Sequence, residues 1–440
     1  MSETIIPTVD VAGLQVHSTT KRELLASIDS RISTKQQTSV ITPYSEFLYE
    51  ALINPISLAL YNRATFRIVD GVGVIWASKF LSIPLTFKSY YGKAAQAFWQ
   101  MVYSGAAIIF NPKFIYKHFP EKIVGADLFW DLAELAANRS YKLYLLGAQD
   151  NIAEQTAKIL KNKFPNIHIV GVSNKHWQDP SIINDVKQSG AEMIFVAFSP
   201  PKQERWVIDE FPKTGAMFAI GLGGTFDYIV GNKLQPPRFI RAIGLEWLHR
   251  LITQPKRVKR IWRAVVGLIT ALIRYKVFSS MPYRENVVIV ISNSENKVLV
   301  CQRNPNGYAY GSGRKPDATF DNYWQFPQGG IDSGEDVLAG ARREAVEETG
   351  LENLEYQKTQ TNVNKYSWNN ARRALLFNPL KYRGQMQSIV YFQHVGSDDA
   401  VKLDTHNNEF VAYRWVDRSE LGSVLHEERR NIAEIVVQNI

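Results

Sequence analysis

Short apolar runs, each followed by a polar or glycine-rich turn, recur along residues 8–80 and 122–250 and constrain the fold more than any other feature. Helix-like amphipathic stretches separate them. A short run that is apolar throughout is typical of a strand buried on both faces, as in a parallel sheet covered by helices. The runs are SVIT at 39–42, KLYLLG at 142–147, IHIVGV at 167–172, EMIFVAF at 192–198 and MFAIGLGG at 217–224. This alternation predicts an α/β domain built on parallel strands.

The pattern changes near residue 280. The sequence VFSSMPYRE at 277–285 is typical of a linker, and two strand-like runs joined by the turn sequence NSEN follow it, which predicts a hairpin. We therefore predict one domain at 1–276, a linker at 277–285 and a second domain at 286–440. In a chain of 440 residues each domain is long enough to bury its own core.

Basic residues are concentrated at the end of the first domain. The formal net charge is +9, and residues 236–276 hold ten basic residues and one acid, so the rest of the chain sums to zero. The ten are Arg238, Arg241, Arg250, Lys256, Arg257, Lys259, Arg260, Arg263, Arg274 and Lys276. The basicity therefore belongs to one segment and not to the whole protein.

This segment contains an apolar run of ten residues, 264–273, flanked by Trp262 and Tyr275. A bilayer needs about 20 apolar residues, so the run is too short for a transmembrane helix. We expect 236–276 to be a basic amphipathic tail on an anionic membrane surface. A core helix with solvated, charged ends is the alternative. A third possibility, nucleic-acid binding, would give an affinity that falls steeply with salt.

The single cysteine, Cys301, excludes an intramolecular disulfide and fits a reducing compartment. The N-terminus has no basic segment followed by an apolar run, so no secretory signal is expected. Both features predict a cytoplasmic location.

The most specific motif is GGIDSGEDVLAGARREAVEETGL at 329–351. Residues 336–349 are predicted to be helical, so Glu344, Glu347 and Glu348 share one face. Crowded carboxylates raise one another's pKa unless a cation neutralises them, and their hard oxygen atoms favour Mg²⁺ or Mn²⁺. We expect Arg343 to pair with Glu335, outside the helix. A solvated face is the ordinary interpretation of such a cluster, and the complete motif argues against it.

The motif resembles the Nudix box at Gly329, at Glu335 and at every fixed position from Arg343 to Leu351. The resemblance covers about residues 283–440 and implies an α/β/α domain with a mixed sheet. It also implies metal-dependent hydrolysis of a nucleoside-diphosphate-linked substrate, with Mg²⁺ or Mn²⁺ lowering the pKa of an attacking water. The expected metal ligands are Glu344, Glu347, Glu348 and Gly329, the expected catalytic residues are Glu344, Glu347 and Glu409, and Arg343 is an expected substrate-binding residue.

Within that family, YWQFPQGGID and GQMQSIVYF resemble bacterial RNA pyrophosphohydrolases and diadenosine polyphosphate hydrolases. Glu409 is, on this resemblance, an extra metal ligand or general base, and its alternative is a surface acid beside a strand. Two interpretations remain open for Tyr366, Trp368, Arg372 and Arg373: they stack on or neutralise a nucleotide, or they belong to a solvated loop. The loop at 304–322 is longer than this branch usually carries, which leaves the substrate open.

Five segments of the first domain together resemble the WecG/TagA/CpsF family, glycosyltransferase family 26, over about residues 8–276. They are RIVDGVGVIWASKFL at 67–81, KIVGADL at 122–128, YKLYLLGA at 141–148, SPPKQERWV at 199–207 and the stretch 221–260 that begins GLGGTFD. The resemblance implies a Rossmann-like, inverting transferase without a cofactor. Such an enzyme transfers an N-acetylhexosamine, typically N-acetylmannosamine, from a UDP-sugar donor to a polyprenyl-diphosphate-linked acceptor at the cytoplasmic membrane face.

The same resemblance assigns expected roles to residues. Asp70 is the expected general base, worth typically about 10²–10⁴ in rate. Thr42 and Gln203 are expected near the donor, and Gly223, Gly224 and Asp227 form the turn that would accept UDP. Taken alone, Asp70 before a glycine is an ordinary turn former and Asp227 an ordinary helix cap.

The sequence also departs from the family. Val69 stands where a proline is usual, Tyr44 where an asparagine is usual, and Lys122 where an arginine is usual. A changed donor sugar is therefore plausible. Residues 85–120 resemble an insertion and hold ten aromatic residues in 36, where the whole chain is 12% aromatic. Interfacial aromatics beside a lipid acceptor or aromatic core packing would explain this equally well.

Together these features predict a bifunctional enzyme, cytoplasmic and peripheral to the inner face of the cell membrane. Its expected partners are the UDP-sugar, the lipid-linked acceptor, an anionic membrane surface and a nucleotide substrate, with RNA only as a 5′ end. The alternative is an inactive membrane-binding N-terminal module that locates an RNA 5′-pyrophosphohydrolase.

Overall fold

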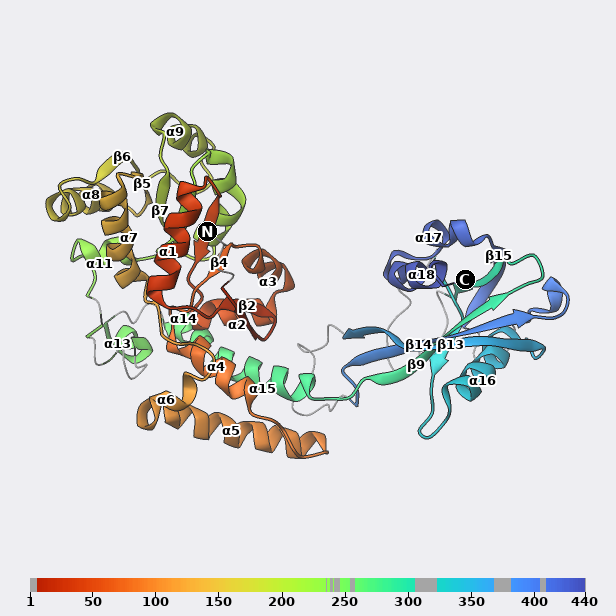
Figure 1. The fold of residues 1–440 in the computed structure, drawn as a ribbon. Helices are drawn as coiled ribbons and strands as arrows, with labels where there is room; N and C mark the ends of the chain where they lie inside the picture. Colours follow the sequence, from red (N-terminus) through yellow and green to blue (C-terminus); the bar gives the residue numbers. More distant parts are fainter. Residues whose placement is uncertain are drawn as a thin grey trace. The chain divides into compact units, whose positions relative to one another are not determined.

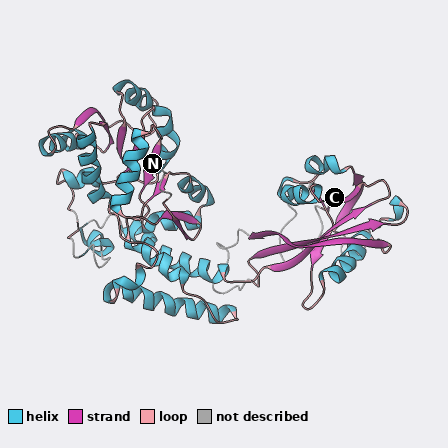
Figure 2. Cartoon of the chain, in the orientation of Figure 1, coloured by secondary structure: helices cyan, strands magenta, loops and turns pink. Residues whose placement is uncertain are grey.

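The computed structural model describes residues 6–234, 236–237, 240, 246–253, 258–304, 323–367, 381–403 and 409–439. They form two compact units that meet in sequence between Val277 and Phe278 (Figures 1 and 2). Several residues singled out above lie outside the described part: Arg238, Arg241, Lys256, Arg257, Trp368, Arg372, Arg373 and most of the loop 304–322.

A six-stranded parallel sheet organises the first unit, with the strand order β4-β3-β8-β7-β5-β6. The strands are β3 (Thr38–Ile41), β4 (Phe66–Arg67), β5 (Lys142–Gly147), β6 (His168–Ser173), β7 (Met193–Ala197) and β8 (Phe218–Gly221). A short antiparallel hairpin, β1 (Thr8–Val11) and β2 (Leu14–His17), precedes them. The predicted α/β fold with a parallel, Rossmann-like sheet is confirmed.

Helices cover both faces of this sheet. They are α1 (Lys21–Ser33), α2 (Ser45–Ile53), α3 (Pro55–Asn62), α4 (Val72–Ser82), α5 (Tyr90–Phe110), α6 (Pro112–Ile115), α7 (Gly125–Arg139), α8 (Ile152–Lys163), α9 (Ser181–Ser189), α10 (Lys202–Arg205) and α11 (Thr225–Ile229). A π-helical turn, Trp206–Glu210, and a 3₁₀ turn, Phe211–Thr214, continue α10.

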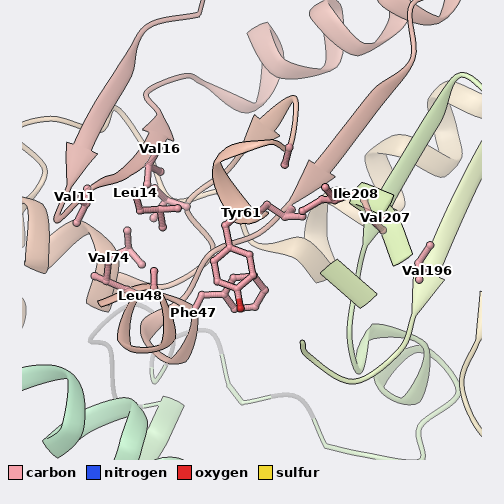
Figure 3. Close-up of a cluster of buried hydrophobic side chains, with 14 of the residues drawn as sticks. Val11, Leu14, Val16, Phe47, Leu48, Tyr61, Val74, Val196, Val207 and Ile208 are labelled. Carbon is pink, nitrogen blue, oxygen red and sulfur yellow. The ribbon is translucent and has the colours of Figure 1, made fainter. Parts of the chain in front are cut away.

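Alternate residues along each strand supply two separate cores. Leu143 and Leu145 belong to the core on the α1 and α7 side, whereas Tyr144 and Leu146 belong to the other. This is the alternation expected of a strand whose successive side chains point to opposite faces. Figure 3 shows part of the second core, where Val11, Leu14 and Val16 of the hairpin approach Leu48, Phe47 and Tyr61.

Beyond the sheet, the basic segment is helical over most of its described residues. It contains α13 (Glu246–Thr253), α14 (Val258–Trp262), a π-helical turn at Arg263–Gly267 and α15 (Leu268–Ser279). Leu268 and Leu272 are buried in the core of the first unit. The apolar run 264–273 therefore matches the core-helix alternative along α15, because its apolar face is already covered by protein.

The linker expected at 277–285 is shorter in the structure. Helix α15 continues to Ser279 and the next strand begins at Arg284, so only residues 280–283 separate them. Val277 and Phe278 are buried, which explains why the helix does not stop at Lys276.

A seven-stranded mixed sheet organises the second unit. Its strands are β9 (Arg284–Ser292), β10 (Val298–Arg303), β11 (Trp324–Gln325), β12 (Gln328–Gly330), β13 (Leu354–Ser367), β14 (Gly384–His394) and β15 (Phe410–Val416). The pair β9 and β14 is parallel, and the other pairs are antiparallel. The predicted hairpin is present as β9 and β10.

Helices lie on both faces of the mixed sheet. Ala341 and Ala345 of α16 (Val337–Thr349) pack on one face. Leu421 of α17 (Leu421–Val424) and Val436 of α18 (Arg430–Val437) pack on the other. Short 3₁₀ turns lie at Asp398–Ala400, Arg418–Glu420 and Glu427–Arg429. The predicted α/β/α architecture is confirmed.

Candidate active sites

A cavity of about 830 Å³ lies in the first unit, at the carboxyl ends of the parallel strands. In an open α/β sheet, ligands bind at this edge because the loops that follow the strands meet there. All six residues singled out for the transferase line this cavity: Thr42, Asp70, Gln203, Gly223, Gly224 and Asp227. They follow β3, β4, β7 and β8, so only the folded sheet brings them together.

Asp70 is held at the start of two helices. It directly precedes Gly71 and α4, and its Oδ1 accepts a 3.0 Å hydrogen bond from the backbone nitrogen of Gly125 at the start of α7. A Cβ at Gly125 would lie 3.7 Å from Asp70 Oδ2 and 3.9 Å from Thr42 Oγ1, so the two side chains border the same helix start. The carboxylate is therefore fixed in the wall of the cavity.

Gln203 fixes the glycine turn that also lines the cavity. Its side chain is buried, and its Oε1 accepts a 2.8 Å hydrogen bond from the backbone nitrogen of Gly223. Gly223 has a φ of +55°, in the left-handed region that glycine adopts most easily. Asp227, one helical turn later, forms a 2.9 Å ion pair with Lys233 and accepts a hydrogen bond from Asn232.

Of the three departures noted in the sequence, Tyr44 lines this cavity, Lys122 contacts a residue that lines it, and Val69 is buried in the core. The hydroxyl of Tyr44 donates a 3.0 Å hydrogen bond to Glu46. Lys122 forms a 3.3 Å ion pair with Glu246, which lines the cavity from α13. The tail thus supplies a carboxylate to the site.

Sequence reasoning missed several lining residues, chiefly those in the turns after β5 and β6. They are Gln149, Asp150, Asn174, Lys175, His176 and Trp177, together with Lys202 and Lys233. The rule that a cavity forms where parallel strands end would have selected these turns once the apolar runs were accepted as strands.

In the second unit, β12 and α16 hold the Nudix-like motif. Asp336 caps α16, its side chain accepting hydrogen bonds from Leu338 and Ala339. A Cβ on Gly329 would lie 1.8 Å from Cδ of Glu344, so only glycine leaves space for that carboxylate.

Arg343 links the acidic side chains of this motif. The predicted ion pair with Glu335 is present, with both guanidinium contacts at 2.9 Å. The same guanidinium donates to Glu344 at 2.8 Å, to Glu347 at 3.3 Å and to the carbonyl oxygen of Gly330 at 2.8 Å. Arg343 hydrogen bonding lowers the pKa of Glu335 to about 2, with help from the backbone nitrogen of Asp332.

Glu348 is the buried acid of the group. Its Oε2 accepts a 2.8 Å hydrogen bond from the backbone nitrogen of Gln328. Burial, and then the charge of Glu409, raise the pKa of Glu348 well above its ordinary value. Burial also raises the pKa of Glu344, with smaller contributions from Glu347 and Glu409. Glu409 directly precedes β15, and its interactions with Glu348 and Glu344 place it close to these acids of α16.

The donor chemistry fits a hard divalent cation. Glu344, Glu348 and Glu409 are all carboxylates. After burial, the charges of Glu409 and Glu344 raise the pKa of Glu348 further, as happens where a cation would relieve the repulsion between acids. Within the described residues, however, no group of three or more His, Cys, Asp or Glu side chains is arranged to hold a metal ion. Arg343 instead neutralises Glu344 and Glu347.

No helix in the described part of the chain is both long enough and apolar enough to cross a membrane.

Comparisons with known proteins assign both parts of the chain. The model of the glycosyl transferase WecG/TagA/CpsF family matches residues 9–102 and 86–281, and the NUDIX domain model matches residues 282–438. The chain is 28% identical over 248 residues to an N-acetylglucosaminyldiphosphoundecaprenol N-acetyl-beta-D-mannosaminyltransferase of Bacillus spizizenii, which covers 56% of this chain and 82% of that protein. An enzyme of the same name from Staphylococcus aureus is 24% identical over 259 residues, 58% of this chain and 87% of the relative.

Solved structures similar to this chain include the MutT protein of Methanosarcina mazei, with 21% identity and a TM-score of 0.25 over 36% of this chain and 95% of that one. A C. elegans Ap4A hydrolase has 16% identity and a TM-score of 0.24 over 35% and 96%. Both family models describe enzymes, so the chain is an enzyme. It belongs to the WecG/TagA/CpsF family of glycosyl transferases, and the residues after that domain match the NUDIX domain.

Proposed function

We propose that this chain is a bifunctional enzyme. Its first unit transfers an N-acetylhexosamine of the N-acetylmannosamine type from a UDP-sugar to a polyprenyl-diphosphate-linked acceptor. Its second unit hydrolyses a nucleoside-diphosphate-linked substrate. The observation that carries the transferase proposal is that Thr42, Asp70, Gln203, Gly223, Gly224 and Asp227 all line one cavity at the carboxyl ends of the sheet. The names of the relatives support the choice of sugar and acceptor.

In the transferase reaction, Asp70 accepts the proton of the attacking acceptor hydroxyl. The backbone nitrogen of Gly125 orients its carboxylate for this. Gln203 holds the turn at Gly223, whose lack of a side chain lets the backbone approach a diphosphate. Lys175, Lys202 and Lys233 also line the cavity and supply positive charge for that diphosphate.

In the hydrolase reaction, Glu344, Glu348 and Glu409 would hold Mg²⁺ or Mn²⁺, with Glu347 and the carbonyl oxygen of Gly329 as the remaining proposed ligands. A bound divalent ion supplies a water of lowered pKa and neutralises diphosphate charge. Arg343 keeps Glu344 and Glu347 in place through its contacts to both and to Glu335. For this unit Glu344, Glu347 and Glu409 remain the proposed catalytic residues, and Arg343 is a proposed contact to substrate phosphate.

We place the enzyme in the cytoplasm, peripheral to the inner face of the cell membrane. A long polyprenyl chain cannot leave the bilayer, so an enzyme that uses such an acceptor must work at its surface. The basic segment 236–276 supports an anionic surface as partner, because its net charge of +9 equals that of the whole chain. With no basic surplus left outside this segment, RNA fits the second unit only as a 5′ end.

The transferase proposal is tested with Asp70→Asn, which keeps the size of the side chain and removes the base. We expect sugar transfer from UDP-N-acetylmannosamine to a lipid-linked acceptor to fall about 10²–10⁴-fold. Hydrolysis by the second unit should be unchanged. Asp209→Asn, at an exposed carboxylate paired with Arg63, is the matched control. Undiminished transfer by Asp70→Asn contradicts the assigned base, and no transfer by the wild type favours a first unit that only locates the hydrolase.

The hydrolase proposal is tested by screening nucleotide sugars, dinucleotides and triphosphorylated RNA with Mg²⁺ and measuring released phosphate. We expect activity on at least one nucleoside-diphosphate-linked compound, loss of that activity in EDTA and loss in Glu348→Gln. Full activity in EDTA contradicts the metal requirement.

A further inference from the structure

Helix α5 (Tyr90–Phe110) is apolar on both of its faces. One face packs on α4 through small side chains, of which Ala97, Ser104 and Ala107 are buried. The indole nitrogen of Trp76 donates a 2.9 Å hydrogen bond to the hydroxyl of Ser104 and fixes this contact. The helix therefore has a defined orientation in the first unit, and its outer face is defined too.

The outer face carries large apolar side chains that stay largely accessible within the described part of the unit. Their exposed fractions run from 42% at Val102 to 85% at Phe110. The set is Tyr91, Phe98, Trp99, Val102, Tyr103, Ile109 and Phe110, with Phe87 just before the helix. With 3.6 residues per turn they fall within an arc of about 140°. We name this set the α5 face.

Such a face is unusual for a helix at a protein–water boundary. A surface helix normally turns charged and polar residues outward, and a helix that is apolar all round is covered by protein or lipid. The only charged residue within α5 is Lys93, and α5 does not qualify as a membrane-crossing helix. An apolar face rich in Trp, Tyr and Phe suits the boundary between lipid headgroups and acyl chains.

The charges around α5 indicate which surface it meets. Residues 83–120 contain four lysines, Lys88, Lys93, Lys113 and Lys117, and no acidic residue. Lys88 precedes the helix, while Lys113 and Lys117 follow it, and all three are exposed. Cationic side chains at both ends of an aromatic helix complement an anionic bilayer, whose attraction for each is worth about 1 kcal/mol near the surface.

We propose that the α5 face inserts into the interfacial layer of an anionic lipid bilayer and is the main membrane-binding element of the first unit. The apolar run of the tail cannot serve in this way along α15, because Leu268 and Leu272 are already buried. In Figure 1, α5 lies along the side of the first unit that also holds α4, α6 and α15. Because α4 starts just after Asp70 and packs on α5, this orientation keeps the proposed base near the lipid surface.

The test uses the full-length chain with vesicles of phosphatidylglycerol and phosphatidylethanolamine, and with vesicles of phosphatidylcholine alone. We expect sedimentation with the anionic vesicles, weakened by salt, and much less with phosphatidylcholine. The double variant Trp99→Glu/Phe110→Glu should bind on the order of tenfold or more weakly. Ile56→Glu, at an exposed apolar residue of α3, and Trp262→Glu, in the tail, are matched controls that should keep most of the binding.

A second measurement does not depend on a loss of binding. Brominated lipid should quench the fluorescence of the wild type more than that of Trp99→Phe, because Trp99 lies on the α5 face. Equal quenching, or vesicle binding by the double variant equal to the wild type, overturns the proposal. So does a dimer in sedimentation velocity without lipid that the double variant dissociates, since the α5 face would then bind a second copy of the chain.

The role assigned to the α5 face rests on the proposed transferase function. The membrane-binding proposal and the transferase proposal can nevertheless be contradicted by different experiments. Vesicle binding is measured without any reaction. Conversely, transfer to a short-chain, water-soluble acceptor should be unchanged in Trp99→Glu/Phe110→Glu, because neither residue lines the catalytic cavity. No transfer by the wild type contradicts the enzymatic proposal and leaves the membrane result intact.

Discussion

Gly329 bears no side chain at a point where Glu344 fills the available space. A Cβ there would lie 1.8 Å from Glu344 Cδ and about 2 Å from both of its oxygen atoms, so Gly329→Ala must displace the carboxylate. We expect hydrolysis of a nucleoside-diphosphate substrate to fall by at least about tenfold, measured as released phosphate. Gly422→Ala is the matched control, because a Cβ there meets no atom within 4 Å. Full activity of Gly329→Ala would show that hydrolysis does not require the Glu344 carboxylate in its present position.

Glu335 makes the free energy of unfolding of the second unit depend on pH in the acid range. Its folded-state pKa is lowered from 4.5 to about 2 by Arg343, so it stabilises the folded state above pH 4.5 and loses that effect as the pH falls towards 2. We expect Glu335→Gln to be less stable than the wild type at neutral pH, and the difference to narrow on acidification. Urea unfolding followed between those pH values measures this. Glu352→Gln, at an exposed glutamate, is the control, and a difference that does not depend on pH contradicts the role of the ion pair.

These residues also show how far sequence reasoning reaches at this scale. The pairing of Arg343 with Glu335 was predictable because eight residues of helix and turn fix the geometry. Two other contacts could not be predicted: the hydrogen bond from Gly223 to Gln203 and the ion pair of Lys122 with Glu246. Lys122 and Glu246, for example, are 124 positions apart in the sequence and meet only in the folded domain. The neutralisation of Glu344 by its neighbour Arg343 was also missed, because adjacent helical residues normally point apart.

At the scale of the element, Lys276 anchors α15 to α4. It is buried, its ammonium group donates a hydrogen bond to the carbonyl oxygen of Phe80, and it lies 4.2 Å from the centre of the Phe80 ring. A cation near the last turn of α4 also interacts favourably with the helix dipole. Burial lowers the pKa of Lys276 to about 8.

Because Lys276 of α15 is buried, the stability of the first unit should depend on pH in alkaline solution. Between about pH 8 and the ordinary lysine value of 10.5, the unfolded chain binds a proton that the folded chain has released, so stability gains a term that rises with pH. We expect the free energy of unfolding of the wild type to rise relative to that of Lys276→Met across this interval. Urea titrations at several pH values measure it, with Lys161→Met, at an exposed lysine of α8, as control. Curves that stay parallel contradict the buried position of the ammonium group.

The elements themselves divide into predictable and unpredictable ones for a physical reason. Strands such as β5 and β7 were predictable because a short run that is apolar throughout is typical of a strand buried on both faces of a sheet. The run at 264–273 and the aromatic segment at 85–120 were ambiguous, because an apolar helix buried in protein and one facing lipid have the same composition. The structure separates them by burial: Leu272 is covered, whereas Trp99 is exposed.

At the scale of the whole molecule, each unit has hydrophobic clusters of its own. The two clusters of the first unit and the two of the second have no residue in common. The sequence predicted this organisation because its apolar pattern and its motifs both change near residue 280. Its estimate of the linker was too long, since apolar residues extend α15 beyond Lys276.

Separate cores predict separate unfolding. We expect two thermal transitions in calorimetry, because a domain with its own core unfolds as its own cooperative unit. Leu14→Ala should lower the midpoint of one transition and Val300→Ala that of the other, since both side chains are buried, one in each unit. These two variants assign the transitions without cutting the chain.

Ligands should then act on one transition each. A ligand at 100 times its dissociation constant stabilises the unit that binds it by about 2.7 kcal/mol, and each kcal/mol raises the midpoint by about 2–4 °C for a domain of 150–250 residues. UDP should therefore raise only the transition lowered by Leu14→Ala, and Mg²⁺ only the one lowered by Val300→Ala. Asp70→Asn should leave the Mg²⁺ effect unchanged, because Asp70 lies in the cavity of the first unit. A UDP effect on the second transition, or a single transition that both ligands raise, contradicts two independent sites and indicates one cooperative enzyme.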